Sequence, residues 1–326
     1  MFLLNKIEGK GKKNSEKLNT IKQKSKTIDI IATLQSDIST LSNAVNDLKL
    51  LQGRQMAIAN RSRHSEIIEN INEAEFKVYS QWGDDGIIQF LVDYLQIRNK
   101  TFIEFGVENY TEANTRFLLI NNFWSGLVMD GSERNVAQIK ASNIYWQYQL
   151  DAECCFITKD NINQLISSYT QMTEIGLLVI DVDGNDYWIW ESINNIKPII
   201  VIAEYNGLFG NKRAITVPYK ADFQRTNRHY SNLYYGASLK ALQLLAESKG
   251  YALVACNNNG NNAFFVRNDQ LKQLKEISVE QAYKNATFSE SRNESDKLTY
   301  LNFEEASNLI KGLPVVNILT GQQEGF

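Results

Sequence analysis

The feature that most constrains the fold is a run of four apolar residues that leads directly into a group of acids. Residues 177–180 read Leu-Leu-Val-Ile, and Asp181, Asp183 and Asp186 follow them. Four consecutive apolar residues indicate a strand that is covered on both faces of a parallel sheet. Ligands of open α/β sheets bind beyond the carboxyl ends of the strands. The acids are therefore candidates for chemistry, and the alternative is a solvated loop with an Asp-Gly turn.

Segments typical of strands alternate with segments of helical spacing along most of the chain. The expected strands are residues 101–105, 126–129, 154–158, 177–180 and 199–203. The expected helices are residues 84–95, 112–120, 135–141, 161–169, 187–193, 239–249 and 304–311. An Asn/Gly-rich turn joins two further strands, 251–256 and 262–267, which predicts a hairpin. The pattern predicts an α/β fold: a doubly wound, mostly parallel, seven-stranded Rossmann-like sheet with an antiparallel terminal hairpin.

Three parts follow one another along the chain. Residues 1–26 lack periodicity, and we expect a basic, disordered tail. Residues 27–75 are expected to be a helical extension that resembles a coiled coil and acts in oligomerisation or as a linker, before a catalytic domain over 76–326. The apolar seam of this extension has heptad spacing and consists of Ile31, Leu34, Ile38, Leu41, Val45 and Leu48. A helix that packs on its own domain is the alternative to a homo-oligomer.

The charge of the chain is unevenly distributed. The formal net charge is −3, but residues 1–26 hold eight lysines and two glutamates, so the rest carries about −9. An acidic body argues against nucleic acid as a partner, because phosphate contacts need a basic face. The tail is a candidate for peripheral contact with an anionic membrane. Three cysteines without a ligand pattern fit a reducing cytoplasm, and no apolar run is long enough to span a membrane.

The ends of the first three predicted strands point to a cofactor that carries no phosphate. Gly106 stands alone between Glu104 and Glu108, whereas a dinucleotide site needs several glycines around its pyrophosphate. Two acids there favour the ammonium and sulfonium groups of S-adenosylmethionine. Asp130 follows the second strand and suits the ribose hydroxyls. Beyond the third strand, the residues expected to bind the adenine edge are Thr158, Asp160 and Asn161.

At these residues the chain resembles the class I S-adenosylmethionine-dependent methyltransferases, and among them the FkbM-like group and its sugar-methylating relatives. The resemblance covers about residues 78–270, and its motifs are Ser80-Gln-Trp-Gly-Asp-Asp-Gly, Phe102-Ile-Glu-Phe-Gly, Leu127-Val-Met-Asp, Ile180-Asp-Val-Asp-Gly and Glu204-Tyr-Asn. The family usually has Glu where this chain has Asp183, and it carries more glycines after Gly106. The resemblance implies an S-adenosylmethionine-dependent methyltransferase.

Two arrangements are open for handling an acceptor hydroxyl. His229 lies in a long loop expected to cover the site and is a candidate general base, together with Asp183 and Glu204. Alternatively, Asp181, Asp183 and Glu204 bind Mg²⁺, which prefers oxygen ligands. Some antibiotic and sugar methyltransferases of this fold resemble that arrangement. Without the metal, Asp181 would hold the methionine ammonium group of the cofactor.

The leading hypothesis is an O-methyltransferase that acts on a sugar hydroxyl of a surface glycan or its nucleotide-linked precursor, in polysaccharide biosynthesis. Aromatic and asparagine residues around the acids suit a sugar ring and its hydroxyls. One alternative is a nucleotide-sugar glycosyltransferase, in which Asp181 and Asp183 would bind the metal. The other is a non-catalytic scaffold in glycan biosynthesis.

Overall fold

The computed structural model describes residues 2–287 and 290–326, and the side chains of these residues except 2–22 and 25. The chain forms two compact units, Met1–Gln52 and Gly53–Phe326. The first unit consists of the helix α1, which has the bounds Phe2–Ser62 and continues into the second unit. None of the described helices combines the length and the apolar composition that a membrane span requires.

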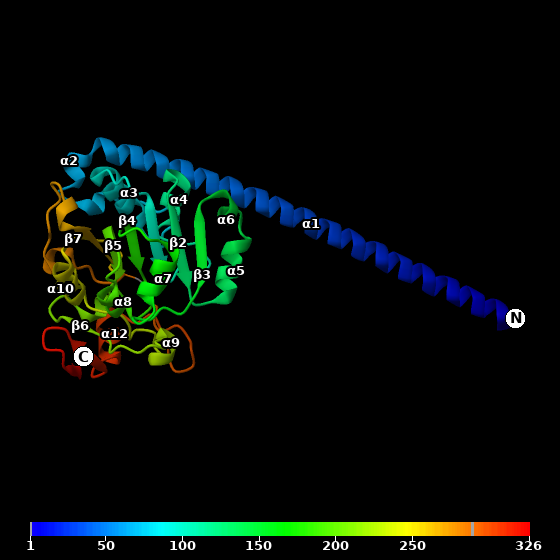
Figure 1. The fold of residues 1–326 in the computed structure, drawn as a ribbon. Coiled ribbons are helices and arrows are strands. Elements are labelled where there is room, and N and C mark those ends of the chain that lie inside the picture. Colours follow the sequence, from blue (N-terminus) through cyan, green and yellow to red (C-terminus); the bar gives the residue numbers. More distant parts are fainter. Residues whose placement is uncertain (1, 288–289) are drawn as a thin grey trace. The chain divides into compact units, whose positions relative to one another are not determined.

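A seven-stranded sheet forms the centre of the second unit (Figure 1). Its strands are β1 (Thr101–Phe105), β2 (Ser125–Asp130), β3 (Leu150–Cys154), β4 (Glu174–Ile180), β5 (Lys197–Glu204), β7 (Tyr251–Cys256) and β8 (Asn262–Arg267). The order across the sheet is β3-β2-β1-β4-β5-β8-β7. The first five strands pair in parallel, and β8 pairs antiparallel with both β5 and β7. The predicted Rossmann-like sheet with its antiparallel hairpin is therefore confirmed.

Alternate residues of the central strands feed two separate cores, because successive side chains of a strand point to opposite faces. Phe102 and Val179 belong to the core on one face, and Ile103 and Ile180 belong to the core on the other. The first face is covered by α3 (Asp84–Leu95), α4 (Arg116–Asn122), α5 (Glu133–Ala141) and α6 (Asn143–Gln147). The second is covered by α7 (Ile162–Tyr169), α8 (Asp186–Ser192), α10 (Leu239–Lys249) and α11 (Val279–Ala282).

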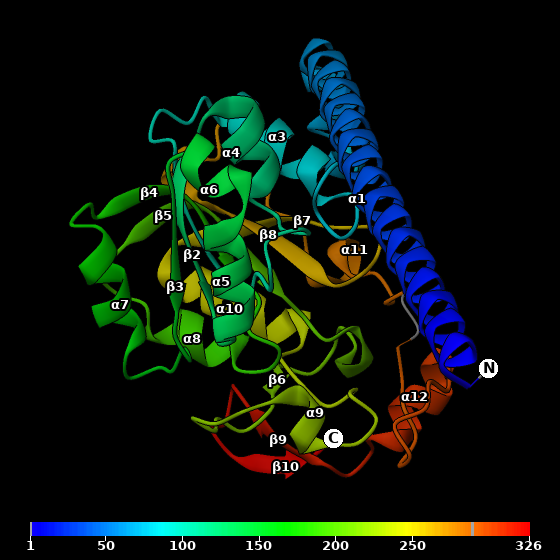
Figure 2. The ribbon, with the colours of Figure 1, turned by 90° about the vertical axis from the view of Figure 1, so that its right-hand side faces the viewer.

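A second, small sheet lies beside the main one and was not predicted. It consists of β6 (Ile215–Thr216), β9 (Pro314–Asn317) and β10 (Gln323–Gly325), with β9 in the centre (Figure 2). Its core also takes in α12 (Phe303–Leu309). The loop from β5 to β6 contains the short helix η2 (Gly207–Phe209), and α9 (Arg225–Arg228) follows β6. This small sheet supports the segment around α9 that reaches the candidate site.

The N-terminal boundaries differ from those expected. The backbone of α1 is helical from Phe2, whereas the sequence suggested a disordered tail over residues 1–26. The second unit begins at Gly53 rather than at residue 76, because Gly53, Ala57 and Asn60 are buried in it. A side chain at position 53 would collide with Val78 and Phe117. The connecting elements α2 (His64–Ile67) and η1 (Ile71–Ala74) also contribute buried residues.

Most of the other predicted elements are confirmed within a few residues. The helix bounds of α3 and α10 and the strand bounds of β1, β7 and β8 agree with the predicted ranges. Gly250 ends α10 in the left-handed conformation, as its position predicts. The predicted strand over 154–158 is wrong, because β3 occupies Leu150–Cys154. Residues 155–158 form the connection that follows β3, and this shift changes which side chains reach the site.

Candidate functional site

The site lies where the order of the strands reverses. β1 has β2 on one side and β4 on the other, and their carboxyl ends separate to leave a crevice there. Gly106 follows β1 directly with a φ of 70°, and Asp181 follows β4. A Cβ on Gly106 would lie 1.7 Å from the carbonyl oxygen of Asp181. Only glycine therefore allows the two loops to meet at the floor of the crevice.

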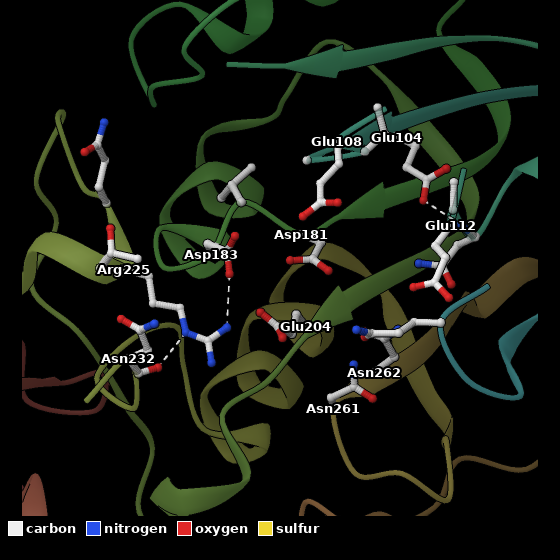
Figure 3. Close-up of a pocket in the computed structure, with 18 of the residues that line it drawn as sticks. Glu104, Glu108, Glu112, Asp181, Asp183, Glu204, Arg225, Asn232, Asn261 and Asn262 are labelled. Atoms are coloured by element: carbon white, nitrogen blue, oxygen red, sulfur yellow. Dashed lines mark hydrogen bonds and ion pairs between the residues drawn. The ribbon is translucent and has the colours of Figure 1, made fainter. Parts of the chain in front are cut away.

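A cavity of about 620 Å³ opens at this edge of the sheet (Figure 3). Seven carboxylates of the residues that the structure describes line it: Glu104, Glu108, Glu112, Asp181, Asp183, Glu204 and Glu290. Arg225 is the one basic side chain among the described residues that line it. Its other walls include the amides of Asn232, Asn261 and Asn262 and the rings of Phe156 and Phe223. The cavity therefore combines a strong negative charge with hydrogen-bonding amides and two aromatic surfaces.

Three carboxylates from the ends of β4 and β5 converge at the floor of this cavity. Asp181, Asp183 and Glu204 each present an oxygen, and these oxygens lie within 4.8 Å of one another. Glu204 is buried, and its Oε2 has no hydrogen-bond partner among the described residues. Burial raises the pKa of the Glu204 carboxyl well above its ordinary value, and the charges of Asp181 and Asp183 raise it further. Such a group binds a proton or a cation readily.

The third acid of the loop after β4 has a structural role. Asp186 is fully buried at the start of α8 and accepts hydrogen bonds from the backbone N–H groups of Val182 (2.8 Å) and Gly184 (3.0 Å). These bonds hold the turn in which Asp183 adopts a φ of 55°. Burial raises the pKa of Asp186 to about 6 despite these bonds. Asp186 therefore shapes the loop that presents Asp181 and Asp183.

Arg225 brings a positive charge into the acidic cavity from α9. Its Nη1 donates to Asp183 Oδ1 at 3.2 Å, and its Nε donates to the carbonyl oxygen of Asn232 at 2.6 Å. The guanidinium group stacks over the ring of Tyr235, 3.9 Å from the centroid. Nη2 is buried and has no hydrogen-bond partner among the described residues. Arg225 thus offsets part of the negative charge and keeps one donor free for a ligand.

Glu104 lines the cavity, but its carboxylate is occupied by the loop that follows β1. It accepts hydrogen bonds from the backbone N–H groups of Asn114 (2.8 Å) and Thr115 (3.0 Å) and from the Thr115 hydroxyl. Burial raises the pKa of Glu104, and these bonds counter the shift. Residues 107–115 are thereby fastened against the end of β1. Of the predicted cofactor residues, Gly106 and Glu108 lie on this loop and also line the cavity.

A smaller hollow of about 160 Å³ continues from the cavity past Gly106 toward the ends of β2 and β3. Asp130 lies in it, together with Met129, Gly131, Cys155 and Phe156. Asp130 Oδ2 accepts from the backbone N–H of Glu108 at 2.8 Å, and Oδ1 accepts from the N–H of Ser132 at 2.8 Å. The carboxylate therefore joins the loops after β1 and β2. Asp130, the residue predicted to bind the ribose hydroxyls, thus lies in the smaller hollow, and its hydrogen bonds hold the loops around it.

The structure does not bring Thr158, Asp160 and Asn161 into either hollow, so their predicted contact with adenine is not what the geometry shows. Asn161 Oδ1 accepts from the Thr158 N–H at 2.8 Å, and Thr158 Oγ1 accepts from the Asn161 N–H at 3.2 Å. The two residues close a turn before α7, and Asp160 is exposed. Because β3 ends at Cys154, the residues that reach the hollow are Cys155, Phe156 and Ile157.

His229 also lies outside the cavity, although its neighbours Arg225 and Asn232 line it. Its Nδ1 forms a hydrogen bond of 2.7 Å with the Ser231 hydroxyl, and its ring packs on Tyr230. Partial burial lowers the pKa of the imidazole. The structure thus brings Asp183 and Glu204 together but leaves His229 aside, and Glu204 is the group at the floor that is free to take a proton.

Sequence reasoning missed Arg225, Phe156 and Phe223 as site residues. Arg225 was visible as a cation in the loop that contains His229, and the acidity of the strand ends around it was the signal for an ion pair. Phe223 packs against Gly184, where a Cβ would come within 2.0 Å of its ring. This contact ties the segment before α9 to the turn after β4.

No protein-family model matches this chain, and no curated protein matches it. Among solved structures, the N-terminal domain of EvdMO1 with SAH bound is similar over 58% of this chain and 80% of that chain, with 9% identity and a TM-score of 0.38. A putative caffeoyl-CoA O-methyltransferase from Staphylococcus aureus covers 67% of this chain and 99% of its own, with 13% identity and a TM-score of 0.40. The O-methyltransferase from Bacillus cereus in complex with SAH is similar over 67% of this chain and 88% of that chain, with 13% identity and a TM-score of 0.36.

Proposed function

We propose that this protein is an S-adenosylmethionine-dependent O-methyltransferase that acts on a sugar hydroxyl. The supporting observation is the pair of connected hollows at the topological switch point, which share Gly106, Phe156, Asp181, Val182, Asp183 and Phe223. The smaller hollow offers Asp130 and an aromatic ring, and the larger offers carboxylates and amides. This division suits a cofactor with a nucleoside at one end and a positive charge at the other, placed beside a polyhydroxy acceptor.

The residues present fit S-adenosylmethionine better than a phosphate-bearing cofactor. The loop after β1 contains the single glycine Gly106, and Glu104 and Glu108 flank it, so a pyrophosphate would meet carboxylates there. Asp130 would receive the ribose hydroxyls, Phe156 would stack on the adenine, and Asp181 would face the ammonium group. When bound, this cofactor supplies an activated methyl group whose transfer to a hydroxyl forms an ether, leaves S-adenosylhomocysteine and releases the hydroxyl proton.

The chain's own contribution to the reaction is to position the acceptor and take its proton. Glu204 Oε2 is buried and unpaired at the floor, which makes it the candidate general base. Arg225 limits the mobility of Asp183 through their ion pair. The segment from Phe223 to Asn232 forms one wall of the cavity and restricts the access of water. Asp183 and Glu204 are thus the predicted catalytic residues that the geometry supports, and His229 is not.

A sugar acceptor fits the chemistry of the larger cavity. Asn232, Asn261 and Asn262 offer both donors and acceptors, which suits hydroxyl groups. The rings of Phe156 and Phe223 offer apolar surfaces for a sugar face. The excess of carboxylates disfavours a nucleotide diphosphate, because the like charges would repel each other. This argues for a glycan or free sugar rather than a nucleotide-linked precursor, and against the glycosyltransferase alternative.

Binding of a divalent cation is a second candidate role for the acids at the floor of the cavity. Asp181, Asp183 and Glu204 supply three oxygens close enough to share one ion, and the orphaned Glu204 oxygen would gain a partner. An all-oxygen set fits Mg²⁺, which would lower the pKa of an acceptor hydroxyl and orient it.

Two measurements test the proposal. Calorimetry should show binding of S-adenosylmethionine and S-adenosylhomocysteine but not of uridine diphosphate sugars, and mass spectrometry should then detect a gain of one methyl group on an oligosaccharide library. Binding of the nucleotide sugar alone would contradict the proposal and favour the glycosyltransferase.

Treatment with EDTA followed by Mg²⁺ distinguishes the two roles of the acids. Activity that disappears and returns indicates a metal site, and unchanged activity indicates proton transfer by Glu204.

A further inference from the structure

Six large apolar side chains lie exposed along one stripe of α1. Their exposed fractions are 49% for Ile31, 53% for Leu34, 66% for Ile38, 66% for Leu41, 44% for Val45 and 65% for Leu48. Side chains of this size are usually covered, and a single exposed one would need no explanation. Six of them at alternating spacings of three and four residues form a continuous seam, which is typical of a helix that packs against another helix.

The two heptad positions that form the seam, a and d, hold different classes of apolar residue, and each position always holds the same class. In heptad notation the a positions are Ile31, Ile38 and Val45, and all three are β-branched. The d positions are Leu34, Leu41 and Leu48, and all three are leucine. Among parallel coiled coils, β-branched residues at a combined with leucine at d favour two strands over three or four. The pattern therefore indicates two strands for a parallel association of these helices.

The residues that flank the seam keep it narrow. In the two heptads from Ile31 to Ala44, the e and g positions are Gln35, Asp37, Ser42 and Ala44, which are polar or small. Exposed Ile28 and Ile30 before this stretch and Leu51 after it occupy e and g positions, so the seam is broader only at its ends. Its middle, limited to a and d positions, suits two strands, whereas larger bundles need broader apolar faces. Identical chains in register would place each a residue beside its own copy and each d residue beside its own copy. The seam is thus complementary to itself.

The side of α1 that carries the seam is also free further along the helix. Gly53, Ala57 and Asn60 are the buried residues of its last turns, and they fall at the heptad positions b, f and b. At about 100° per residue these positions point roughly opposite to the a and d positions of the same turns, Gln52, Gln55, Ala59 and Ser62, which are exposed.

We propose that residues 31–48 form a parallel, in-register, two-stranded coiled coil with the same residues of a second copy of this chain. The contact covers about 27 Å of helix. Because it is short, the dimer should dissociate on dilution. The proposal does not depend on the enzymatic activity, since no residue of the cavity takes part.

Light scattering on the full chain at several concentrations tests the stoichiometry. The mass expected at high concentration is twice the chain mass of 37.2 kDa. Leu41→Asp should return the protein to the monomer mass, because a buried charge would face its own copy across the seam. Asn43→Asp is the matched control, since residue 43 is exposed at an f position and its change should leave the dimer intact. Circular dichroism on both variants shows whether the helix persists.

Crosslinking tests the direction. In a chain whose exposed Cys154 is replaced by serine, Ile31→Cys should give a covalent dimer with a short bismaleimide. An antiparallel pair would separate the two residues by about 25 Å and give no such product. Ser36→Cys, at an outward f position, is the control that should not crosslink.

Several outcomes would overturn the proposal. A monomer mass at all concentrations would contradict it, and a trimer or tetramer mass would also contradict it. A dimer that survives Leu41→Asp would place the interface elsewhere. Crosslinking between Ile31→Cys and Leu48→Cys chains, without the Ile31 self-product, would establish the antiparallel arrangement. A monomer that binds vesicles of phosphatidylcholine and phosphatidylserine through the seam would replace the second chain with a lipid surface.

Discussion

At the scale of single residues, Gly106 is the position on which the site most depends. It combines a positive φ with a contact that leaves no space for a side chain. Gly106→Ala should cost about 1–3 kcal/mol of backbone strain and force the loops after β1 and β4 apart. We expect a lower melting temperature and a loss of S-adenosylmethionine binding, measured by thermal unfolding and calorimetry. Gly325→Ala, which has space and an ordinary φ, is the control and should change neither.

Glu204 and His229 give a second test at this scale, because the sequence favoured the histidine and the structure favours the acid. Glu204→Gln keeps the shape of the side chain but removes its basicity, and it should reduce kcat by about 10²–10⁴-fold. His229→Ala should keep kcat within a few-fold, since the imidazole is bonded to Ser231 outside the cavity. The two variants should be compared under saturating cofactor with the acceptor identified by mass spectrometry. A collapse of kcat in His229→Ala would restore the histidine as the base.

The residues that could be predicted are those whose role follows from their place at the end of a strand. Glu104, Asp130, Asp181 and Glu204 were identified in this way, because the carboxyl ends of parallel strands share one edge. Thr158 and Asn161 line neither hollow, because β3 lies four residues earlier than predicted and the two residues close the turn before α7. Arg225 was missed although the acids offered it a partner, because its position also depends on stacking with Tyr235 and on the small sheet behind it.

At the scale of elements, long apolar strands and well-capped helices were predictable, and the polar edge strand β3 was not. β4 and β5 are buried along almost their whole length, so their apolar runs are continuous. β3 is an edge strand with exposed Asp151, Glu153 and Cys154, and its sequence does not stand out from its surroundings. The small sheet of β6, β9 and β10 joins segments about one hundred residues apart. Such pairings leave no local pattern.

The start of α3 provides a prediction about pH. Asp84 is fully buried and accepts hydrogen bonds from Asn257 (2.9 Å) and Asn262 (3.4 Å), and burial raises its pKa to about 7 from an ordinary 3.8. The folded state therefore holds this proton more tightly than the unfolded chain. The contribution of protonated Asp84 to the free energy of unfolding is fully present below about pH 4. It is lost as the pH rises toward 7, at up to about 1.4 kcal/mol per pH unit.

Asp84→Asn removes this titration, so the free energy of unfolding should fall less steeply between pH 4 and 7 than in the wild type. Urea unfolding at a series of pH values measures the difference. Asp93→Asn on the same helix is the control, because that carboxylate is only partly buried and pairs with Arg61. Parallel pH curves for Asp84→Asn and the wild type would show that Asp84 is not the group concerned.

At the scale of the whole molecule, the boundary between the two units determines which fragment folds. The second unit begins within α1, and its core includes Ala57, Ile67, Ile71 and Ala74. A chain of residues 53–326 should therefore melt at nearly the same temperature as the full protein and bind cofactor equally well. A chain of residues 76–326 loses these buried residues and should melt at a lower temperature or aggregate. Equal melting temperatures for the two fragments would show that α1, α2 and η1 add nothing to the fold.

The architecture as a whole was predictable because strand-like and helix-like segments alternate clearly over the central domain. The Asn/Gly-rich turn between β7 and β8 indicated the antiparallel hairpin at one end of the sheet. The N-terminal part was less predictable. Residues 53–75 are mostly polar in sequence, and only their few buried side chains attach them to the core. Polar composition alone therefore suggested a linker where the structure has part of the domain.

The antiparallel entry of β8 has a consequence for how the activity of this protein can diversify. Because β8 runs against β5, it starts at the site, and Asn262 pairs with Glu204. Asp130 lies at the end of β2, four strands away across the sheet and so about 19 Å from β8. Changes at such a separation are usually additive in free energy. The combined effect of Asp130→Ala and Asn262→Ala on kcat/KM should thus equal the product of the separate effects, and acceptor preference can change in the turn before β8 while the methyl-donor half stays intact.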